Sequence, residues 1–200
     1  ALLLMEVDIP VKIATALTYG IQTDTLNLYR ARRADVIKTY SQILPRCDMR
    51  ALARIQNPSR SRRFFKTLRK GMQNAMVRRG LIVSHLGLVE NPDLVSQVAE
   101  FLLTYERSHW SLCTGRYKGK MHVSLRSMKP DAKAGEVLRD IFVERGKAGG
   151  HGAIAGGSLE VGQDVEDAVW EEIENNLIQR LVKRLRISLK SQFYFPFRNE

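Results

Sequence analysis

The amino-acid sequence predicts an α/β protein in which a small mixed sheet is flanked by helices and an all-helical segment precedes the sheet. Two observations support this fold class. Residues 1–55 contain only helical patterns and loops, whereas residues 80–160 alternate between strand-like and helix-like patterns, as small α/β domains do. The long helical pattern between them predicts a helical connector over 56–79. The α/β domain is expected to extend over 80–200 and to finish with a C-terminal helix.

Three segments of the first part combine apolar residues at helical spacing with a residue that starts or stops a helix. They are Val11–Tyr19, Ala34–Leu44 and Asp48–Ile55. Pro10 suits the start of the first helix, Pro45 stops the second, and Asp48 is expected to cap the third. We expect Gly20 to end the first helix, so that the sequence IQTDT at 21–25 forms a loop with acceptor side chains.

The chain after Pro58 shows helical periods of 3.6 residues and short strand-like alternations, with the sequence KGK at 118–120 as a turn between two strands. The expected elements are a helix over Ser59–Arg79, a strand over Leu81–Leu86, a helix that starts near Asn91, a β-hairpin of Trp110–Thr114 and Met121–Leu125, and helices over Ala134–Arg145 and Val165–Leu189.

The composition is strongly basic. Lys and Arg total 32 against 21 Asp and Glu, which gives a formal net charge of +11 and an isoelectric point near 10.0. Nine Lys or Arg and no acid lie between Arg54 and Arg79, and five more basic residues lie between Arg180 and Lys190. Such a surface attracts polyanions, so nucleic acid or nucleotide phosphate is the expected partner. A basic surface with no particular ligand is the alternative.

Cysteine usage and hydropathy indicate in which cellular compartment the protein lies. Cys47 and Cys113 lie far apart without metal-ligand spacing, which is typical of reduced thiols in a cytoplasmic protein. No apolar run approaches the roughly 18 residues of a membrane span, and nothing resembles a signal peptide. We therefore expect a cytoplasmic protein that does not enter a membrane. The apolar start at Ala1–Met5, without an initiator methionine, leads us to expect a fragment of a longer protein.

The most distinctive stretch is Arg145–Ser158, which reads RGKAGGHGAIAGGS and contains six glycines, three alanines and one histidine. Glycine lets another molecule approach the backbone closely. A flexible linker would be more polar, whereas this run carries Ile154 and alanines that can pack. We therefore predict a ligand-binding loop whose N–H groups hold an anion, with His151 as an additional hydrogen-bond donor.

Three stretches together resemble the DHH-family phosphoesterases with their associated C-terminal domain. They are ATALTYGIQTDT at Ala14–Thr25, HVSLRS at His122–Ser127 and AGGHGAIAGG at Ala148–Gly157. That family contains RecJ-like nucleases, nanoRNases that also dephosphorylate 3′-phosphoadenosine 5′-phosphate, and cyclic dinucleotide phosphodiesterases. Ile154 departs from the alanine that is more common in the family, which reshapes the expected cradle. The resemblance implies that residues 1–55 are the helical end of the DHH catalytic domain and 80–200 the DHH-associated domain.

The resemblance also implies site residues. Asp24 matches one aspartate of the family's two-manganese cluster, and a carboxylate is a suitable ligand for such a cation. Arg126 would pair with a substrate phosphate through its bidentate fork. His151 would donate a hydrogen bond to a phosphate or nucleotide end. The complete expected substrate-binding set is Arg126, Ser127, Gly149, Gly150, His151, Ala155 and Gly156.

The function implied by the resemblance is manganese-dependent hydrolysis of a phosphoester in short oligonucleotides, cyclic dinucleotides or nucleotide phosphates. This chain would supply substrate binding, and the intact protein is compatible with a homodimer. No DHH triplet or DxD pair occurs in the 200 residues, so we expect the chain alone to be catalytically inactive, because one aspartate cannot hold two metal ions. The alternative from another class is a non-catalytic basic module that binds single-stranded nucleic acid through the 59–79 helix and the basic C-terminal segment.

Overall fold

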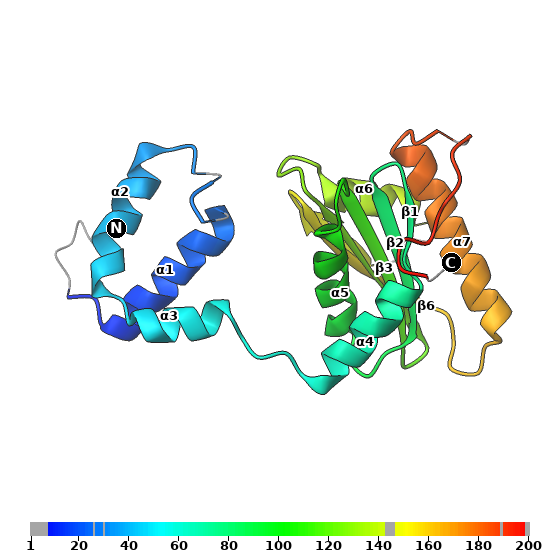
Figure 1. Ribbon diagram of the computed structural model, residues 1–200, viewed down its shortest axis with the longest axis horizontal. Helices are drawn as coiled ribbons and strands as arrows, with labels where there is room; N and C mark the ends of the chain where they lie inside the picture. The colour runs from blue at the N-terminus through cyan, green and yellow to red at the C-terminus, as the bar shows by residue number, and fades with distance from the viewer. Residues whose placement is uncertain (1–7, 26, 30, 143–146, 189, 199–200) are drawn as a thin grey trace. The chain divides into compact units, whose positions relative to one another are not determined.

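The computed structural model describes residues 8–25, 27–29, 31–142, 147–188 and 190–198. The chain forms two compact units, Ala1–Arg60 and Ser61–Glu200, which are described separately. The first unit is helical, as the sequence predicted. Its elements are α1 (Val11–Thr25), α2 (Ala34–Ile43), a 3₁₀ turn η1 (Leu44–Arg46) and α3 (Met49–Gln56), shown in Figure 1.

The helix boundaries of this unit follow local chemistry. Asp48 caps α3 as predicted, because its Oδ1 accepts hydrogen bonds of 2.9 Å from the backbone N–H groups of Arg50 and Ala51. The predicted stop at Gly20 is wrong, since α1 continues through the IQTDT sequence to Thr25. A glycine inside a helix costs only about 1 kcal/mol. Packing of Ile21 against the small core of this unit favours the continued helix.

The second unit contains a six-stranded mixed sheet with the order β1-β2-β3-β4-β6-β5. Strands β2 and β3 pair in parallel, and every other neighbouring pair is antiparallel. This sheet, flanked by helices, confirms the predicted α/β fold class. The strands are β1 (Met76–Arg78), β2 (Leu81–Leu88), β3 (Trp110–Tyr117), β4 (Lys120–Ser127), β5 (Lys147–His151) and β6 (Ile154–Glu160).

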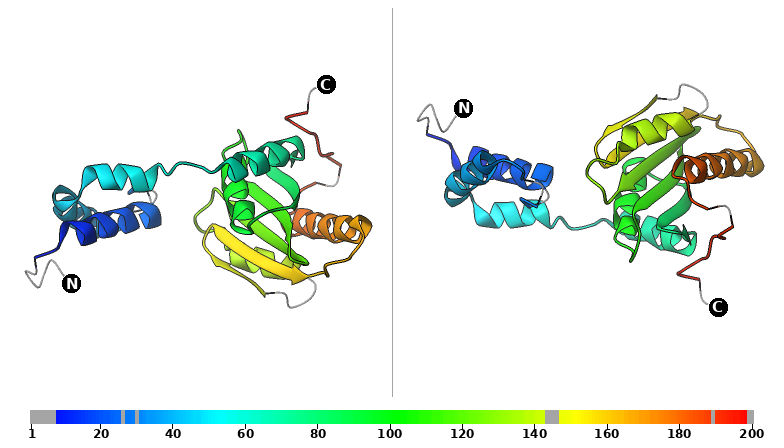
Figure 2. Two further views of the ribbon diagram at one scale, coloured as in Figure 1. Left: turned by 90° about the horizontal axis from the view of Figure 1, so that it is seen from below. Right: turned by 90° about the horizontal axis from the view of Figure 1, so that it is seen from above.

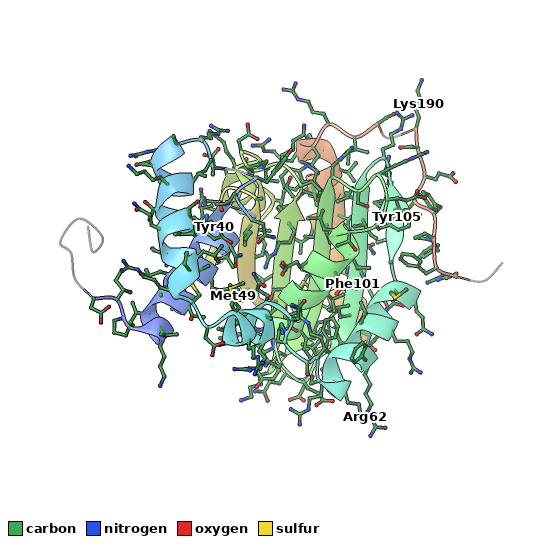
Figure 3. All side chains as sticks on the ribbon, turned by 60° about the vertical axis from the view of Figure 1, so that its left-hand side comes forward. Tyr40, Met49, Arg62, Phe101, Tyr105 and Lys190 are labelled. Carbon is green, nitrogen blue, oxygen red and sulfur yellow. The ribbon has the colours of Figure 1, made fainter. Side chains whose placement is uncertain are left out.

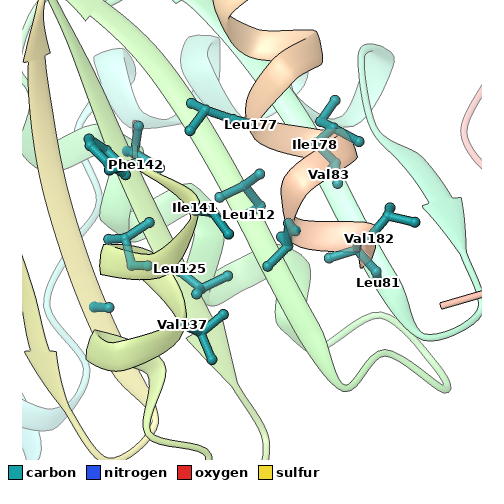
Figure 4. Close-up of a cluster of buried hydrophobic side chains, with 14 of the residues drawn as sticks. Leu81, Val83, Leu112, Leu125, Val137, Ile141, Phe142, Leu177, Ile178 and Val182 are labelled. Atoms are coloured by element: carbon teal, nitrogen blue, oxygen red, sulfur yellow. The ribbon is translucent and has the colours of Figure 1, made fainter. Parts of the chain in front are cut away.

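Helices cover both faces of the sheet (Figure 2). Helices α4 (Arg62–Gln73) and α5 (Asp93–Leu103) pack on one face, and their buried cluster includes Ile82 and Leu86 of β2. Helices α6 (Ala134–Ile141) and α7 (Asp167–Arg184) pack on the other face. Leu81 and Val83 belong to the cluster on this second face, where Figure 4 shows them beneath α7. Successive residues of β2 thus serve opposite cores, as a doubly covered strand requires.

The outward sides of these helices carry polar and isolated apolar side chains. Arg62 at the start of α4 and Phe101 of α5, which is 47% exposed, are labelled in Figure 3. Within the described part of the chain, no helix is long and apolar enough to cross a membrane.

The helix predicted over Ser59–Arg79 is correct only in its middle. Ser61 caps α4 through a 3.2 Å hydrogen bond from the N–H of Phe64, and the helix ends at Gln73. Met76 and Val77, which fall inside the predicted helix, belong to strand β1. Apolar residues in a short run fit a buried strand as well as a helix, so periodicity could not separate the two.

The glycine-rich run is also different from the prediction. Its described part is not a loop but a β-hairpin, in which β5 and β6 are joined by the two-residue turn Gly152–Ala153. The expected helix after Ala134 ends at Ile141, and residues 143–145 of that prediction lie outside the described residues. The final helix begins at Asp167 and ends at Arg184 instead of Leu189, which is itself outside the described residues.

Two neighbouring glycines of β5 provide a test of this hairpin. A Cβ added at Gly150 would lie 2.1 Å from the carbonyl oxygen of Ile154, whereas at Gly149 it meets nothing within 4 Å. We expect Gly150→Ala to lower the free energy of unfolding by about 3 kcal/mol, and the control Gly149→Ala to change it by less than about 1 kcal/mol. Chemical denaturation measures both values. Equal losses in the two variants would contradict the hairpin register.

Candidate functional site

A pocket of about 330 Å³ lies on the face of the sheet that α4 and α5 cover, where β4 and β6 meet the first turn of α5. Strand β4 contributes His122, Ser124 and Arg126 to its lining. Strand β6 contributes Ile154 and Gly156, and the start of α5 forms the remaining wall. The pocket therefore combines two of the three sequence stretches singled out above.

Strand alternation explains why these side chains share one face. His122, Ser124 and Arg126 occupy even positions of β4, while the odd positions are buried against α6 and α7. The antiparallel register then places Ser124 opposite Gly156 and Arg126 opposite Ile154. Small residues on β6 therefore lie next to the polar residues of β4.

Arg126 is the cation of the pocket. Its Nη1 donates hydrogen bonds of 3.1 Å to the carbonyl oxygen of Leu125 and 3.0 Å to that of Ala155. Burial lowers the pKa of its guanidinium below the ordinary value, a shift that the Glu100 carboxylate opposes. Among the described residues no carboxylate lies within 4 Å of Arg126. The guanidinium is thus held in place by neutral carbonyls and stays available to an anion.

The floor of the pocket is open because of two glycines. A Cβ at Gly156 would have only the carbonyl oxygen of Val123 nearby, at 3.7 Å, and one at Gly149, its partner on β5, would have no neighbour within 4 Å. Gly150 and Gly157 differ, since a Cβ at Gly150 would collide with the backbone of Ile154 and one at Gly157 would make tight contacts of 3.1 Å with Ala148 and Phe142. Packing therefore explains Gly150 and Gly157, whereas Gly149 and Gly156 leave space for another molecule.

Two more polar atoms belong to the wall of the pocket. His122 Nε2 and Ser124 Oγ are buried and have no hydrogen-bond partner among the residues that the structure describes. Burial lowers the pKa of His122 below its ordinary value, and the nearby Lys120 charge adds to this effect. A ligand that reached these atoms would remove the cost of leaving them unpaired.

The start of α5 adds a positive potential. Pro92, Asp93 and Ser96 line the pocket, and the first turn of the 11-residue α5 places the positive end of its helix dipole there. The N–H groups of Leu94 and Val95 already donate to the carbonyl oxygens of Asn91 and Pro92. The N–H of Asp93 is occupied by Asn91 Oδ1 at 2.9 Å. The exposed carboxylate of Asp93 partly offsets this potential at the rim.

The structure brings some of the sequence-predicted site residues together and separates others. Arg126, Ala155 and Gly156 line the pocket, and Gly149 lies on the adjacent strand opposite Gly156. Ala155 takes part through its carbonyl oxygen, since its side chain is buried against α6 and α7. His151 is exposed at the end of β5, where it pairs with Ile154.

Two predicted residues have other surroundings. Ser127 occupies an odd position of β4 and is buried, and its hydroxyl accepts a 3.1 Å hydrogen bond from the N–H of Lys129. Gly150 lies against the backbone of Ile154 and of α6, where a Cβ at Gly135 would approach the Gly150 carbonyl oxygen to 2.3 Å. Both residues support the hairpin without lining the pocket.

Asp24 lies in the first unit, on the last turn of α1, and is exposed. In the ranges that the structure describes, no three His, Cys, Asp or Glu side chains gather in a way that could hold a metal ion. The described residues therefore do not form a two-metal site.

Sequence reasoning missed His122 and Ser124 as pocket residues. The signal was present, because HVSLRS alternates polar and apolar residues and would place both side chains on the face of Arg126. No signal identified the wall at Pro92 to Ser96, because only the folded sheet brings α5 to β4.

The fold and pocket define a mixed α/β domain with a half-buried cation above a floor of small residues. Residues 79–179 match the DHHA1 domain, and this chain belongs to the DHHA1 family, the domain associated with DHH-family phosphoesterases. The resemblance inferred from the three motifs is thereby confirmed.

Two further comparisons show what else the chain is similar to. The chain is 30% identical over 162 residues to the uncharacterized protein MJ1633 of Methanocaldococcus jannaschii. The aligned region covers 80% of this chain and 33% of that protein. An exopolyphosphatase-related protein of Bacteroides fragilis has a similar fold, with a TM-score of 0.66 and 17% sequence identity. The superposition covers 88% of this chain and 51% of that protein chain. The chain thus spans about a third of the curated relative and half of the solved one.

The depressed pKa of His122 gives a testable pH dependence. An unfolded histidine binds its proton more readily than folded His122, so the folded state loses stability as the pH falls through the pKa of the folded form. We expect NMR titration to give a His122 pKa below about 6.5. The free energy of unfolding should fall more between pH 7 and pH 5 for the unmodified protein than for His122→Gln. Equal losses would contradict the burial of this imidazole.

Proposed function

We propose that this chain is the substrate-binding part of a manganese-dependent phosphoesterase, and that the pocket on β4 and β6 grips a phosphate of a short oligonucleotide, a cyclic dinucleotide or a nucleotide. The observation that carries the proposal is Arg126, a half-buried cation held by two carbonyl oxygens beside a floor of glycines. Membership of the DHHA1 family supports it.

The geometry suits phosphate binding in two respects. Both recorded hydrogen bonds of Arg126 come from Nη1, so Nε and Nη2 keep donors for a bidentate contact with phosphate oxygens. The bare faces of Gly149 and Gly156 let a phosphate or sugar approach the backbone. Ile154 lies opposite Arg126 and is 51% exposed, so it narrows the pocket on one side.

Catalysis would belong to the intact protein. Manganese would polarise the phosphoryl group and supply an activated water, and Asp24 would be one of its ligands. The residues of this chain would bind and orient the substrate. Arg126 would fix a phosphate, and His151, which is exposed at the end of β5 opposite Ile154, would donate a hydrogen bond to the nucleotide end. The alternative, a non-catalytic basic module for single-stranded nucleic acid, is favoured by the exposed cations of α4 and differs in needing neither Arg126 nor Gly156.

Replacement of Arg126 tests the proposal. In the complete protein with Mn²⁺ and a 5′-phosphorylated dinucleotide, we expect Arg126→Ala to lower kcat/KM by about 10- to 100-fold, because charge-assisted hydrogen bonds contribute about 1.5–3 kcal/mol. Arg126→Lys should recover only part of the loss, since an ammonium lacks the planar fork. The control is Arg139→Ala on the exposed side of α6. An unchanged kcat/KM in Arg126→Ala would contradict the assignment of Arg126 to substrate binding.

The open floor predicts a steric effect. Gly156→Val adds a branched side chain whose Cβ has one neighbouring atom within 4 Å, the carbonyl oxygen of Val123 at 3.7 Å, so we expect the fold to tolerate it. We expect the KM for the same dinucleotide to rise by about tenfold, with a change in the free energy of unfolding below about 1 kcal/mol. Equilibrium denaturation and steady-state kinetics separate the two effects. A normal KM would show that substrate does not approach β6.

A further inference from the structure

A second, larger groove lies along α7, and none of its lining residues belongs to the pocket on β4 and β6. Its volume is about 840 Å³. Six of its lining residues determine its chemistry. They are Arg78 of β1, Asn175, Gln179 and Lys183 of α7, and Arg186 and Phe193 from the chain after α7. The other lining residues are apolar. We refer to it as the α7 groove.

The polar side of the groove is a stripe along one helix. Asn175, Gln179 and Lys183 follow one another at intervals of four residues, so they project from the same side of α7. All three are exposed, and within the described ranges neither their side chains nor that of Arg186 forms a hydrogen bond or an ion pair. Ile178 and Val182 line the groove beneath them and are buried (Figure 4). The polar groups of this stripe are therefore not occupied by contacts within the domain.

The opposite wall is fixed in place. Arg78 Nη2 donates a 2.6 Å hydrogen bond to the carbonyl oxygen of Ser188, and its Nε donates a 3.2 Å bond to Ser191 Oγ. The same guanidinium lies 5.4 Å from the centre of the Phe193 ring. The segment after α7, which includes Lys190 (Figure 3), is therefore held along β1. The groove is built by the fold and does not need a ligand to form.

The charge of the groove is of one sign. Its lining contains Arg78, Lys183 and Arg186 and no carboxylate. A neighbouring pocket shares Asn175 but is lined by the acids Glu171 and Glu174 as well as by Lys70 and Arg116, so the purely cationic lining ends at Asn175. A cationic groove with an apolar floor and an aromatic ring suits a ligand that carries phosphates and flat bases.

We propose that the α7 groove binds single-stranded nucleic acid, with phosphates at Lys183 and Arg186 and bases over the apolar floor beside Phe193. Asn175 and Gln179 offer amide donors and acceptors to base edges. The absence of acids from the lining and the net charge of +11 favour a polyanion over a protein partner. This site goes beyond the proposed phosphate pocket and is independent of Arg126.

Fluorescence anisotropy of the protein with a labelled single-stranded DNA of about 12 nucleotides tests the proposal. We expect Lys183→Glu/Arg186→Glu to weaken binding at least tenfold and to flatten the salt dependence between about 50 and 200 mM, because two phosphate contacts are lost. The matched control is Lys38→Glu/Arg139→Glu, which changes the net charge equally at two exposed helical positions. Arg126→Ala should keep most of this affinity.

A second variant guards against a folding defect. Gln179→Glu is nearly isosteric and exposed, so circular dichroism should show an unchanged fold, and we expect weaker binding by about threefold or more because a carboxylate then faces the phosphates. Equal losses in the two double variants would overturn the proposal, since they would indicate binding by overall charge. Unchanged DNA affinity together with altered self-association of Lys183→Glu/Arg186→Glu in sedimentation would assign the groove to contacts between copies instead.

Discussion

The alternation of side chains along β4 is the constraint on which both the core and the pocket of the second unit depend. Met121, Val123 and Leu125 are buried against α6 and α7, and the residues between them line the pocket. A slip of one residue would exchange the two sets. The hairpin to β3 fixes the register, because Lys118 and Gly119 both take positive φ values, 48° and 72°, which match a tight two-residue turn.

The glycine-rich hairpin contains glycines of two kinds: some are required by close packing, and others leave space beside the pocket. Gly150 and Gly135 let β5 and α6 approach each other at a distance that no side chain allows. Gly149 and Gly156 point toward free space beside Arg126, where packing within the domain places no demand on them. One short sequence thus both closes the core on one face of the sheet and leaves the other face open.

Much of this arrangement could be predicted from the sequence. The fold class, the Asp48 cap and the KGK turn follow from local chemistry, and the family follows from three motifs. The failures have physical reasons. Gly20 did not stop α1 because Ile21 packs in the core. The glycine-rich run showed no strand alternation because most of its residues are glycine or alanine, and its β6 half pairs with β4, a partner distant in sequence. Ser127 carried a motif position but points to the opposite face from Arg126, a difference that a linear motif does not express.

The two outer strands of the sheet differ in how they are protected against association with other chains. At β1, the N–H and carbonyl groups of Val77 pair with Tyr194, so the returning C-terminal segment occupies that edge. At β5, the other outer strand, the glycines offer few side chains for another strand to interlock with. Segments prone to form cross-β aggregates contain few glycines, so the composition that opens the pocket also makes this edge a poor template for strand addition.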